Sequence, residues 1–292
     1  MEIWFISALG GAVLAGLSNF YFKQAAAKEY NAELFTLYGG LISIFLSVFV
    51  LLVLHQPLKF YGIFSMAVLA GGFIAAQTNI FKVHALRFID STIYFPLYKL
   101  LAPAFAILAG VTLFQETFTV FEWLGMILGL LVPLLLITPA EKGRQNNLLA
   151  GLILILVTAI TSVVAAVLNK YATDALVPVS VVLFYASVGI CLGTVSAIHY
   201  KRGLQTFLKD IKEHTTKKLL IGASLRSIFI TASMALMLYA YTVGGTLAAV
   251  QTVHSFYILI PIVLAIVLYS EHWNIQKIIA IVLTVASGAL LH

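Results

Sequence analysis

The sequence predicts an all-α integral membrane protein with ten transmembrane helices, arranged as two inverted five-helix repeats. Three observations lead to this fold class: the composition, the number of long apolar runs, and a pair of glutamates at matching places in the two halves. Of the 292 residues, 62% are hydrophobic and 10% are charged, whereas ordinary soluble domains carry about 25% charged residues. A surface so poor in charge excludes a soluble enzyme or a nucleic-acid-binding domain.

The apolar residues fall into ten runs, and about 20 such residues are enough to cross the ~30 Å hydrocarbon core of a bilayer. Charged residues or turn formers separate most of the runs, for example Lys28-Glu29, Gln56-Pro57 and Gly244-Gly245. The ten runs are residues 3–22, 34–54, 61–86, 92–113, 120–137, 148–168, 179–199, 219–241, 247–269 and 275–291.

The two halves of the chain carry a glutamate at the same place. Glu116 follows the fourth run and Glu271 follows the ninth. Because a half of five helices crosses the membrane an odd number of times, the two halves enter it in opposite directions, which is a common design of transporters. Leucine-rich segments also align by composition alone, but the paired glutamates favour a true repeat. We therefore expect one repeat over residues 1–146 and the second over residues 147–292.

Short motifs surround the fourth run of the chain. They are Ala85-Leu86, Ile89-Asp90-Ser91-Thr92, Pro103, Leu113-Phe114-Gln115-Glu116, Trp123 and Gly125. This set resembles the EamA-type branch of the drug/metabolite transporter superfamily. The second half matches at Pro261, Glu271 and Ser287-Gly288, but no glycine follows Glu271 at the place of Gly125. The resemblance implies an inner cavity, alternating access and cytoplasmic termini.

Basic residues are distributed unevenly over the connections between the runs. Twelve Lys and Arg residues lie on the side opposite the termini, and two, Lys59 and Lys170, lie on the terminal side. Because Lys and Arg mark cytoplasmic loops, this bias predicts a cytoplasmic 199–218 loop and external termini in a multi-pass protein of the cell membrane. The family resemblance implies the opposite orientation, and we follow the charge bias. Residues 201–218 are either an amphipathic helix on anionic headgroups or a solvated loop.

Four residues that can carry positive charge lie inside predicted spans: Lys82, Lys99, Arg226 and His254. Ionisable groups there are costly and usually face a cavity or a partner. No carboxylate lies deep in a span to pair with them, so we expect Lys99, Arg226 and His254 to line a central site for an anionic or zwitterionic organic metabolite. Lys82 lies near the end of its run and is expected to extend to the lipid headgroups. The same alternative stays open for Arg226, and a core histidine stays open for His254.

Polar side chains on neighbouring runs are expected to complete this cavity. Gln251, His254 and Tyr257 recur at helical spacing and share one helix face. The other candidates are Tyr98 beside Lys99, Gln77 and Asn79 in the third run, Asn19 in the first and Asn169 in the sixth. Each of them can instead serve as an interhelical hydrogen-bonding group. Glu116 and Glu271 occupy helix ends and are expected to cap helices rather than to couple protons.

Several absent motifs narrow the function that the sequence predicts. The first run contains no acidic residue. Small multidrug pumps of the superfamily that this chain resembles use a carboxylate in that helix to exchange protons for cationic drugs, so an antiporter of this kind is disfavoured. The chain has no phosphate-binding loop, His-Glu-x-x-His site or Gly-x-Ser-x-Gly turn, which disfavours an ATP-driven pump or an enzyme.

The sequence therefore predicts a secondary transporter that moves a small anionic or zwitterionic metabolite, amino-acid-like or phosphorylated, by alternating access. We expect a monomer or a homodimer surrounded by membrane lipids, with no cofactor, metal or nucleic acid. Uniport, exchange and proton coupling through His254 stay open. The alternative is a membrane-embedded lipid-handling scaffold or enzyme that uses a basic vestibule.

Overall fold

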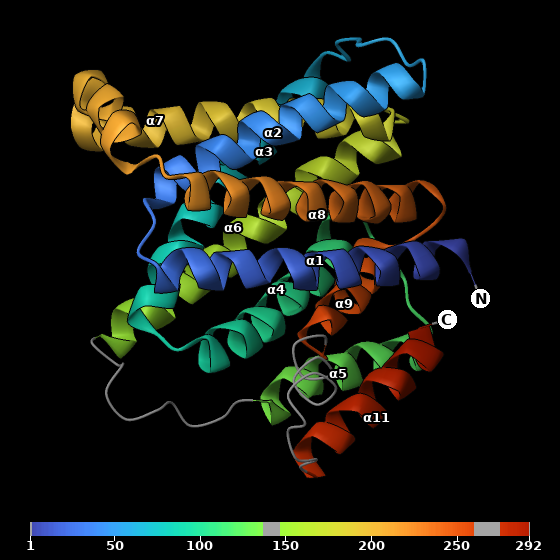
Figure 1. The fold of residues 1–292 in the computed structure, drawn as a ribbon. Coiled ribbons are helices and arrows are strands. Elements are labelled where there is room, and N and C mark those ends of the chain that lie inside the picture. The colour runs from blue at the N-terminus through green and yellow to red at the C-terminus, as the bar shows by residue number, and fades with distance from the viewer. Residues whose placement is uncertain (1, 137–146, 260–274, 292) are drawn as a thin grey trace.

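The computed structural model describes residues 2–136, 147–259 and 275–291, and over these ranges the chain is an all-helical bundle without strands (Figure 1). The helices are α1 (Ile3–Ala27), α2 (Ala32–Val53), α3 (Ile63–Phe88), α4 (Ser91–Leu113), α5 (Val120–Leu135), α6 (Leu148–Asp174), α7 (Val179–His214), α8 (Lys217–Thr242), α9 (Leu247–Ser255) with a 3₁₀ turn (Phe256–Ile258), and α11 (Ile275–Leu291).

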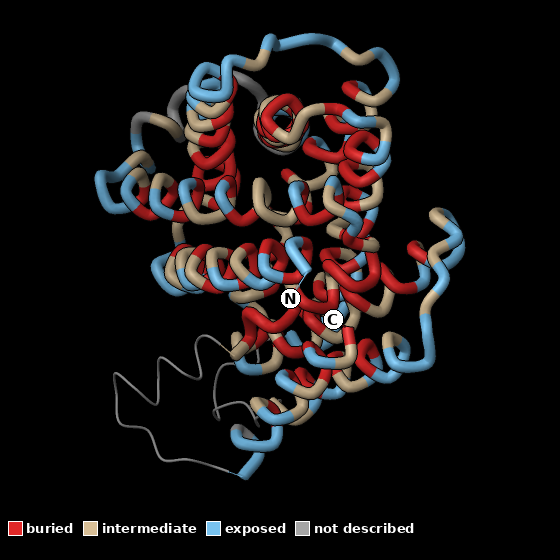
Figure 2. Tube along the Cα trace, turned by 90° about the vertical axis from the view of Figure 1, so that its right-hand side faces the viewer, coloured by how far each residue is buried: buried red, intermediate tan, exposed pale blue. Residues whose placement is uncertain are grey.

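Seven of the described helices are long and apolar enough to cross a membrane, namely α1, α2, α3, α4, α6, α7 over Val179–Tyr200, and α8. Helix α5 and residues Ile278–Leu291 of α11 are shorter apolar helices. Large apolar side chains such as Phe45, Leu52 and Val120 face outward on the bundle, and Figure 2 shows buried residues concentrated in its interior. Extended apolar surface of this kind fits a lipid environment, so the chain is a multi-pass membrane protein.

The connections between helices lie at two opposite ends of the bundle (Figure 1). The terminal end holds both chain termini and the α2–α3, α6–α7 and α8–α9 connections. The basic end holds the α1–α2, α3–α4 and α7–α8 connections, together with the exposed residues Lys28, Arg87, Lys217 and Lys218. The expected separation of basic residues onto one end is therefore present among the described residues.

Two of the predicted ends of apolar runs are wrong. The first run was expected to end at residue 22, but α1 continues to Ala27. The sixth run was expected to end at residue 168, but α6 continues to Asp174 because Lys170 and Asp174 form an ion pair one helical turn apart, with 2.8 Å between Nζ and Oδ2. The seventh run was expected to end at residue 199, and the apolar span of α7 does end at Tyr200. The helix itself continues to His214, so most of the 201–218 segment is helical. The ninth run passes residue 259, and its second part lies outside the described residues, as do Pro261 and Glu271.

The interior of the bundle is built from helix pairs that lie far apart in the sequence. Helix α1 packs along α8, α3 packs along both α6 and α7, α2 packs along α7, and α5 packs along α11. Asn31, Asp90, Asn147, Thr216 and Thr246 cap the helices that follow them through side-chain oxygens. These caps satisfy amide groups that would otherwise lack partners at the start of each helix.

Glycines allow α3 and α7 to approach at backbone distance. A Cβ atom on Gly72 would overlap the carbonyl group of Ala186, and one on Gly193 would lie 2.6 Å from the carbonyl oxygen of Phe73. Gln77 Nε2 also donates to the Gly193 carbonyl oxygen at 2.9 Å. Small residues at such crossings let backbones pack closely inside membranes.

We expect Gly72→Val to destabilise the fold by about 3 kcal/mol or more, because the added atoms meet backbone that cannot rotate away, and overpacking alone costs about 1–3 kcal/mol. Thermal unfolding of the detergent-purified protein measures this loss. Gly222→Ala is the matched control, since its new Cβ would have no neighbour closer than 3.7 Å. Equal melting temperatures for Gly72→Val and the unaltered protein would contradict the close approach.

Candidate functional site

A cavity of about 210 Å³ lies inside the bundle, between α1, α2, α3, α4, α6, α7, α8 and α9 with its 3₁₀ turn. This volume is several times that of one water molecule in the liquid, ~30 Å³. Lining side chains include Asn19, Thr78, Asn79, Lys82, Tyr98, Lys99, Ser162, Asn169, Arg226, Gln251, His254 and Tyr257. The cavity therefore combines small apolar residues with a concentrated set of polar groups.

Lys82 points into this cavity from α3. Its side chain is buried, with 7% of the residue exposed, so the expected extension to lipid headgroups is wrong. Its Nζ lies 4.7 Å from the centre of the Phe22 ring and 4.9 Å from that of Tyr98, and it donates to Asn19 Oδ1 at 3.4 Å. Aromatic faces attract an ammonium group by their quadrupoles, and here they surround a lysine that has no carboxylate partner among the described residues.

Lys99 enters the same cavity from α4 and is 4% exposed. Its Nζ lies 3.9 Å from the centre of the Tyr257 ring and 5.5 Å from that of Tyr98. Tyr98 stacks in turn on Tyr94, with 5.9 Å between ring centres and 10° between planes. Tyr98 thus contacts both lysines, which places Lys82 and Lys99 around one ring.

Arg226 brings a third buried cation to the cavity from α8, with 4% of the residue exposed. Its Cζ lies 4.3 Å from the centre of the Phe22 ring and 5.8 Å from that of Phe35. Gly39 leaves room for the guanidinium, since a Cβ there would lie 2.7 Å from Nη1. Arg226 Nε has no hydrogen-bond partner among the described residues, and a buried donor left in this way is costly unless a ligand or water satisfies it.

His254 lines the cavity from α9. Its Nε2 lies 3.3 Å from Ser233 Oγ, and the Ser233 hydroxyl donates to the Gly11 carbonyl oxygen at 2.7 Å. Because a hydroxyl has one hydrogen to donate, Ser233 accepts from His254, so Nε2 carries a proton. The His254 ring also meets the Tyr257 ring edge to face at 5.8 Å.

Polar side chains near the terminal end of the cavity have unused hydrogen-bonding capacity. Asn169 is 6% exposed, and its Oδ1 has no partner among the described residues, nor does the hydroxyl of Tyr257. Gln251 Nε2 donates to the Tyr241 hydroxyl oxygen at 3.0 Å. Gln251 thereby connects the cavity to a group of charged residues beyond it.

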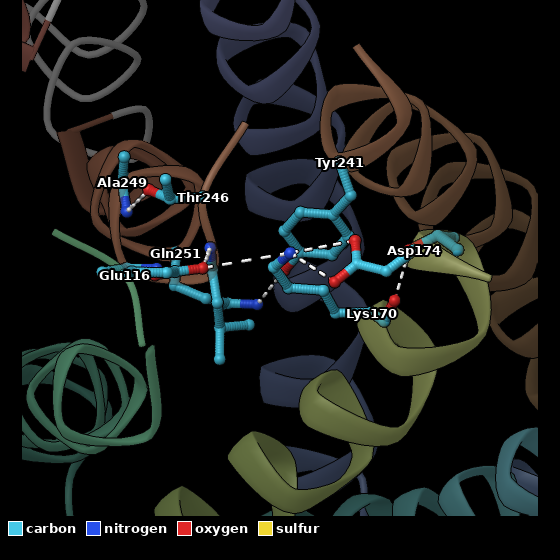
Figure 3. A network of polar contacts seen from close by, with 10 residues as sticks. Glu116, Lys170, Asp174, Tyr241, Thr246, Ala249 and Gln251 are labelled. Carbon is cyan, nitrogen blue, oxygen red and sulfur yellow. Dashed lines mark hydrogen bonds and ion pairs between the residues drawn. The ribbon is translucent and has the colours of Figure 1, made fainter. Parts of the chain in front are cut away.

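That charged group joins α6, α8 and α9 to the α4–α5 connection (Figure 3). Lys170 of α6 is 8% exposed, and its Nζ lies 2.8 Å from Asp174 Oδ2 and 3.9 Å from Glu116 Oε1. Glu116 also accepts from the amide groups of Leu247 at 2.6 Å and Ala248 at 3.2 Å. Glu116 thus caps a helix, as expected, and the helix it caps is α9. We call Glu116, Lys170, Asp174, Tyr241 and Gln251 the terminal network.

The structure brings together nine of the ten residues that the sequence singled out for the cavity. Gln77 does not line the described cavity, because its amide is used in the contact between α3 and α7. Lys82 was predicted to face the headgroups and instead lies in the cavity. Lys170 was counted with the terminal connection and is buried in the terminal network. The nine residues brought together are Asn19, Asn79, Tyr98, Lys99, Asn169, Arg226, Gln251, His254 and Tyr257.

The site has two further properties that bear on its chemistry. None of its described lining residues is an aspartate or a glutamate. Over the ranges that the structure describes, no group of three His, Cys, Asp or Glu side chains is placed to hold a metal ion. The cavity as described therefore presents cations and neutral polar groups to its contents.

No family model and no curated protein matches the chain by sequence. One solved structure, described as a crystal structure of a protein, is similar to it with a TM-score of 0.73 and 15% sequence identity. The match covers 99% of this chain and 98% of the other. At this identity the likeness concerns the fold alone. Fold and site together define a multi-pass α-helical membrane protein with a buried, positively charged cavity.

Proposed function

We propose that the protein is a secondary transporter that moves a small anionic or zwitterionic organic metabolite across the cell membrane by alternating access. The observation that carries this proposal is the central cavity, in which Lys82, Lys99 and Arg226 are buried without a described carboxylate partner. Buried charges are usually paired, and those inside membrane bundles mark ligand pathways. An anionic group of the ligand supplies the missing partner.

We further propose that ten helices form two inverted five-helix repeats, residues 1–146 and 147–292. The packing supports this, since exchanging the halves turns the pair α1 and α8 into α6 and α3. The same exchange turns α4 and α6 into α9 and α1, and both pairs are in contact. Helices α1 and α6 also run in opposite directions between the two ends (Figure 1).

Membership of the EamA-type branch of the drug/metabolite transporter superfamily is part of the same proposal. It is supported by the sequence motifs and by the place of Glu116, which lies between α4 and α5 and caps α9 of the other half. A glutamate at this position thus has a physical role that joins the two halves.

Alternating access requires the cavity to be closed at each end in turn. At the basic end, Phe22, Phe35, Val83 and Leu219 belong to one packed apolar cluster, and we propose that this cluster forms the closure at that end. At the terminal end, the terminal network joins α6, α8 and α9 to the α4–α5 connection (Figure 3). We propose that the terminal network is the terminal gate, which opens when α9 and α6 separate.

The proposal is tested by ligand-dependent thermal stabilisation of the purified protein, followed by uptake into proteoliposomes. The panel contains amino acids, organic acids, sugar phosphates and nucleotide conjugates. A ligand that binds the folded state raises its melting temperature by mass action, and we expect one soluble class to do so and to be taken up. Stabilisation by lipids alone, with no uptake, would favour the lipid-handling scaffold or enzyme.

The excess of exposed basic residues at one end leads to a prediction of orientation. We expect the basic end to face the cytoplasm. A reporter protein that fluoresces only in the cytoplasm should then stay dark when it is fused after residue 292, and should fluoresce when it is inserted at Thr215-Thr216. The reverse pattern would show that the orientation implied by the family resemblance is correct.

A further inference from the structure

We infer that the cavity selects a dianion, a phosphate monoester or a dicarboxylate, over a monoanion or a zwitterion. This inference rests on the proposed transport function and makes its substrate class specific. It is carried by three features of the described cavity: the number of its cations, their arrangement around shared rings, and the absence of an acidic lining residue.

The three cations form one continuous group rather than three separate sites. Lys82 and Arg226 share the Phe22 ring, at 4.7 Å and 4.3 Å from its centre, while Lys82 and Lys99 share the Tyr98 ring, at 4.9 Å and 5.5 Å. Two cations that contact the same ring lie within about 10 Å of each other, and like charges in a poorly solvated space repel one another. A ligand with two negative charges offsets this repulsion better than a ligand with one.

A zwitterion meets an unfavourable environment in the same space. Its ammonium group adds a further positive charge, and no described lining residue offers a carboxylate to receive it. The aromatic faces that could attract an ammonium group are already occupied by protein cations, Phe22 by Lys82 and Arg226, and Tyr257 by Lys99. The cavity therefore discriminates against amino acids by repulsion, which is an effective route to specificity.

The unused groups of the cavity indicate how the dianion lies. Arg226 is near the basic end, and its free Nε together with its other donors suits a forked contact with two oxygens of phosphate or carboxylate. Asn169 is near the terminal end, and its free Oδ1 accepts from a donor such as a hydroxyl group. We place the charged group of the ligand toward Arg226 and Lys82 and its neutral, hydroxyl-bearing part toward Asn169.

Calorimetric titration of the full-length protein in nanodiscs at pH 7.5 tests this inference with four probes. Glycerol 3-phosphate and malate are the two dianions, lactate is the monoanion, and serine is the zwitterion. We expect at least one dianion to bind 10-fold or more tightly than both lactate and serine. The comparison of the two dianions identifies phosphate or dicarboxylate as the preferred group.

Variants of Arg226 and Lys82 test whether these cations cause the preference for a dianion. Arg226→Gln and Lys82→Met should each weaken dianion binding by at least 10-fold and reduce its advantage over lactate, while Arg226→Lys should retain part of it. Lys23→Gln, an exposed lysine on α1 next to Phe22, should bind as the unaltered protein does. Melting temperatures of the empty variants establish that each one is folded.

The outcomes separate this inference from the proposed function. If serine or lactate binds as tightly as both dianions and is transported, the preference for a dianion is overturned and the transporter proposal stands. If no member of this set and no soluble ligand of the wider panel binds, both proposals are overturned.

Discussion

The Lys99→Ala variant is expected to bind and take up its ligand more weakly while becoming no less stable than the unaltered protein. A hydrogen bond to a charged group contributes about 1.5–3 kcal/mol, so the affinity for the transported anion should fall by about 10- to 100-fold. Lys99 has no carboxylate partner among the described residues and is almost fully buried. Removing a buried unpaired charge also removes its desolvation penalty, so the empty protein should melt at the same or a higher temperature.

Because ligand affinity should fall while the melting temperature does not, the two measurements together are decisive. A variant that merely misfolds loses binding and stability together. Removal of a cation that binds the ligand reduces binding alone. Lys23→Ala is the matched control, because it removes an exposed lysine near the same end of the bundle. Unchanged uptake rate and affinity in Lys99→Ala would overturn the placement of the site at this residue.

Lys99 and Lys82 show what the sequence could predict about the site and what it could not. Depth in the membrane is predicted by counting residues at 1.5 Å each, and this counting assigned Lys99 to the interior, where its side chain is buried in the bundle. The same counting placed Lys82 near the headgroups, because Lys82 lies close to the end of its run. Which way a side chain points depends on neighbouring helices, and here the rings of Phe22 and Tyr98 receive the Lys82 ammonium.

The contacts of side chains whose partners lie far away in the chain could not be predicted from the sequence for the same reason. Gln77 has the kind of polar side chain that is expected in a cavity, but its partner, the Gly193 carbonyl group, lies 116 positions away in the chain. Glu116 was expected to cap a helix end, yet nothing local indicated that the helix would be α9, which begins 131 residues later. Hydropathy predicts helices because it is a local property, whereas the pairing of helices is decided by contacts across the bundle.

Glu116→Ala is expected to cause the largest loss of stability in the terminal network. The Glu116 carboxylate accepts two amide groups at the start of α9 and lies 3.9 Å from Lys170 Nζ. Loss of a helix cap costs about 0.5–2 kcal/mol, and removing one partner of a buried ion pair costs about 3–5 kcal/mol. Asp174 still contacts Lys170, so we expect a total loss of about 2–4 kcal/mol. Thermal unfolding in detergent measures it.

The matched control is the acid of the neighbouring helix, Glu122. It forms a capping box with Thr119 at the exposed start of α5, so Glu122→Ala should cost about 1 kcal/mol or less. Adding Lys170→Met to Glu116→Ala should cost less than Lys170→Met costs in the unaltered protein, because the contact between the two side chains is already lost. If the double variant is as unstable as the sum of its single variants, the two side chains do not interact energetically.

A variant of Glu116 also tests whether the terminal network acts as a gate or only as a structural cap. Glu116 holds the start of α9, and α9 carries Gln251 and His254 into the cavity. Releasing it should therefore open the terminal end more often. With Cys191→Ser to remove the native thiol, we expect a hydrophilic maleimide to label Asn169→Cys at least several-fold faster when Glu116→Gln is present. A structural cap predicts lower stability with unchanged labelling, so unchanged labelling would remove the terminal network from the transport cycle and leave it a role in folding alone.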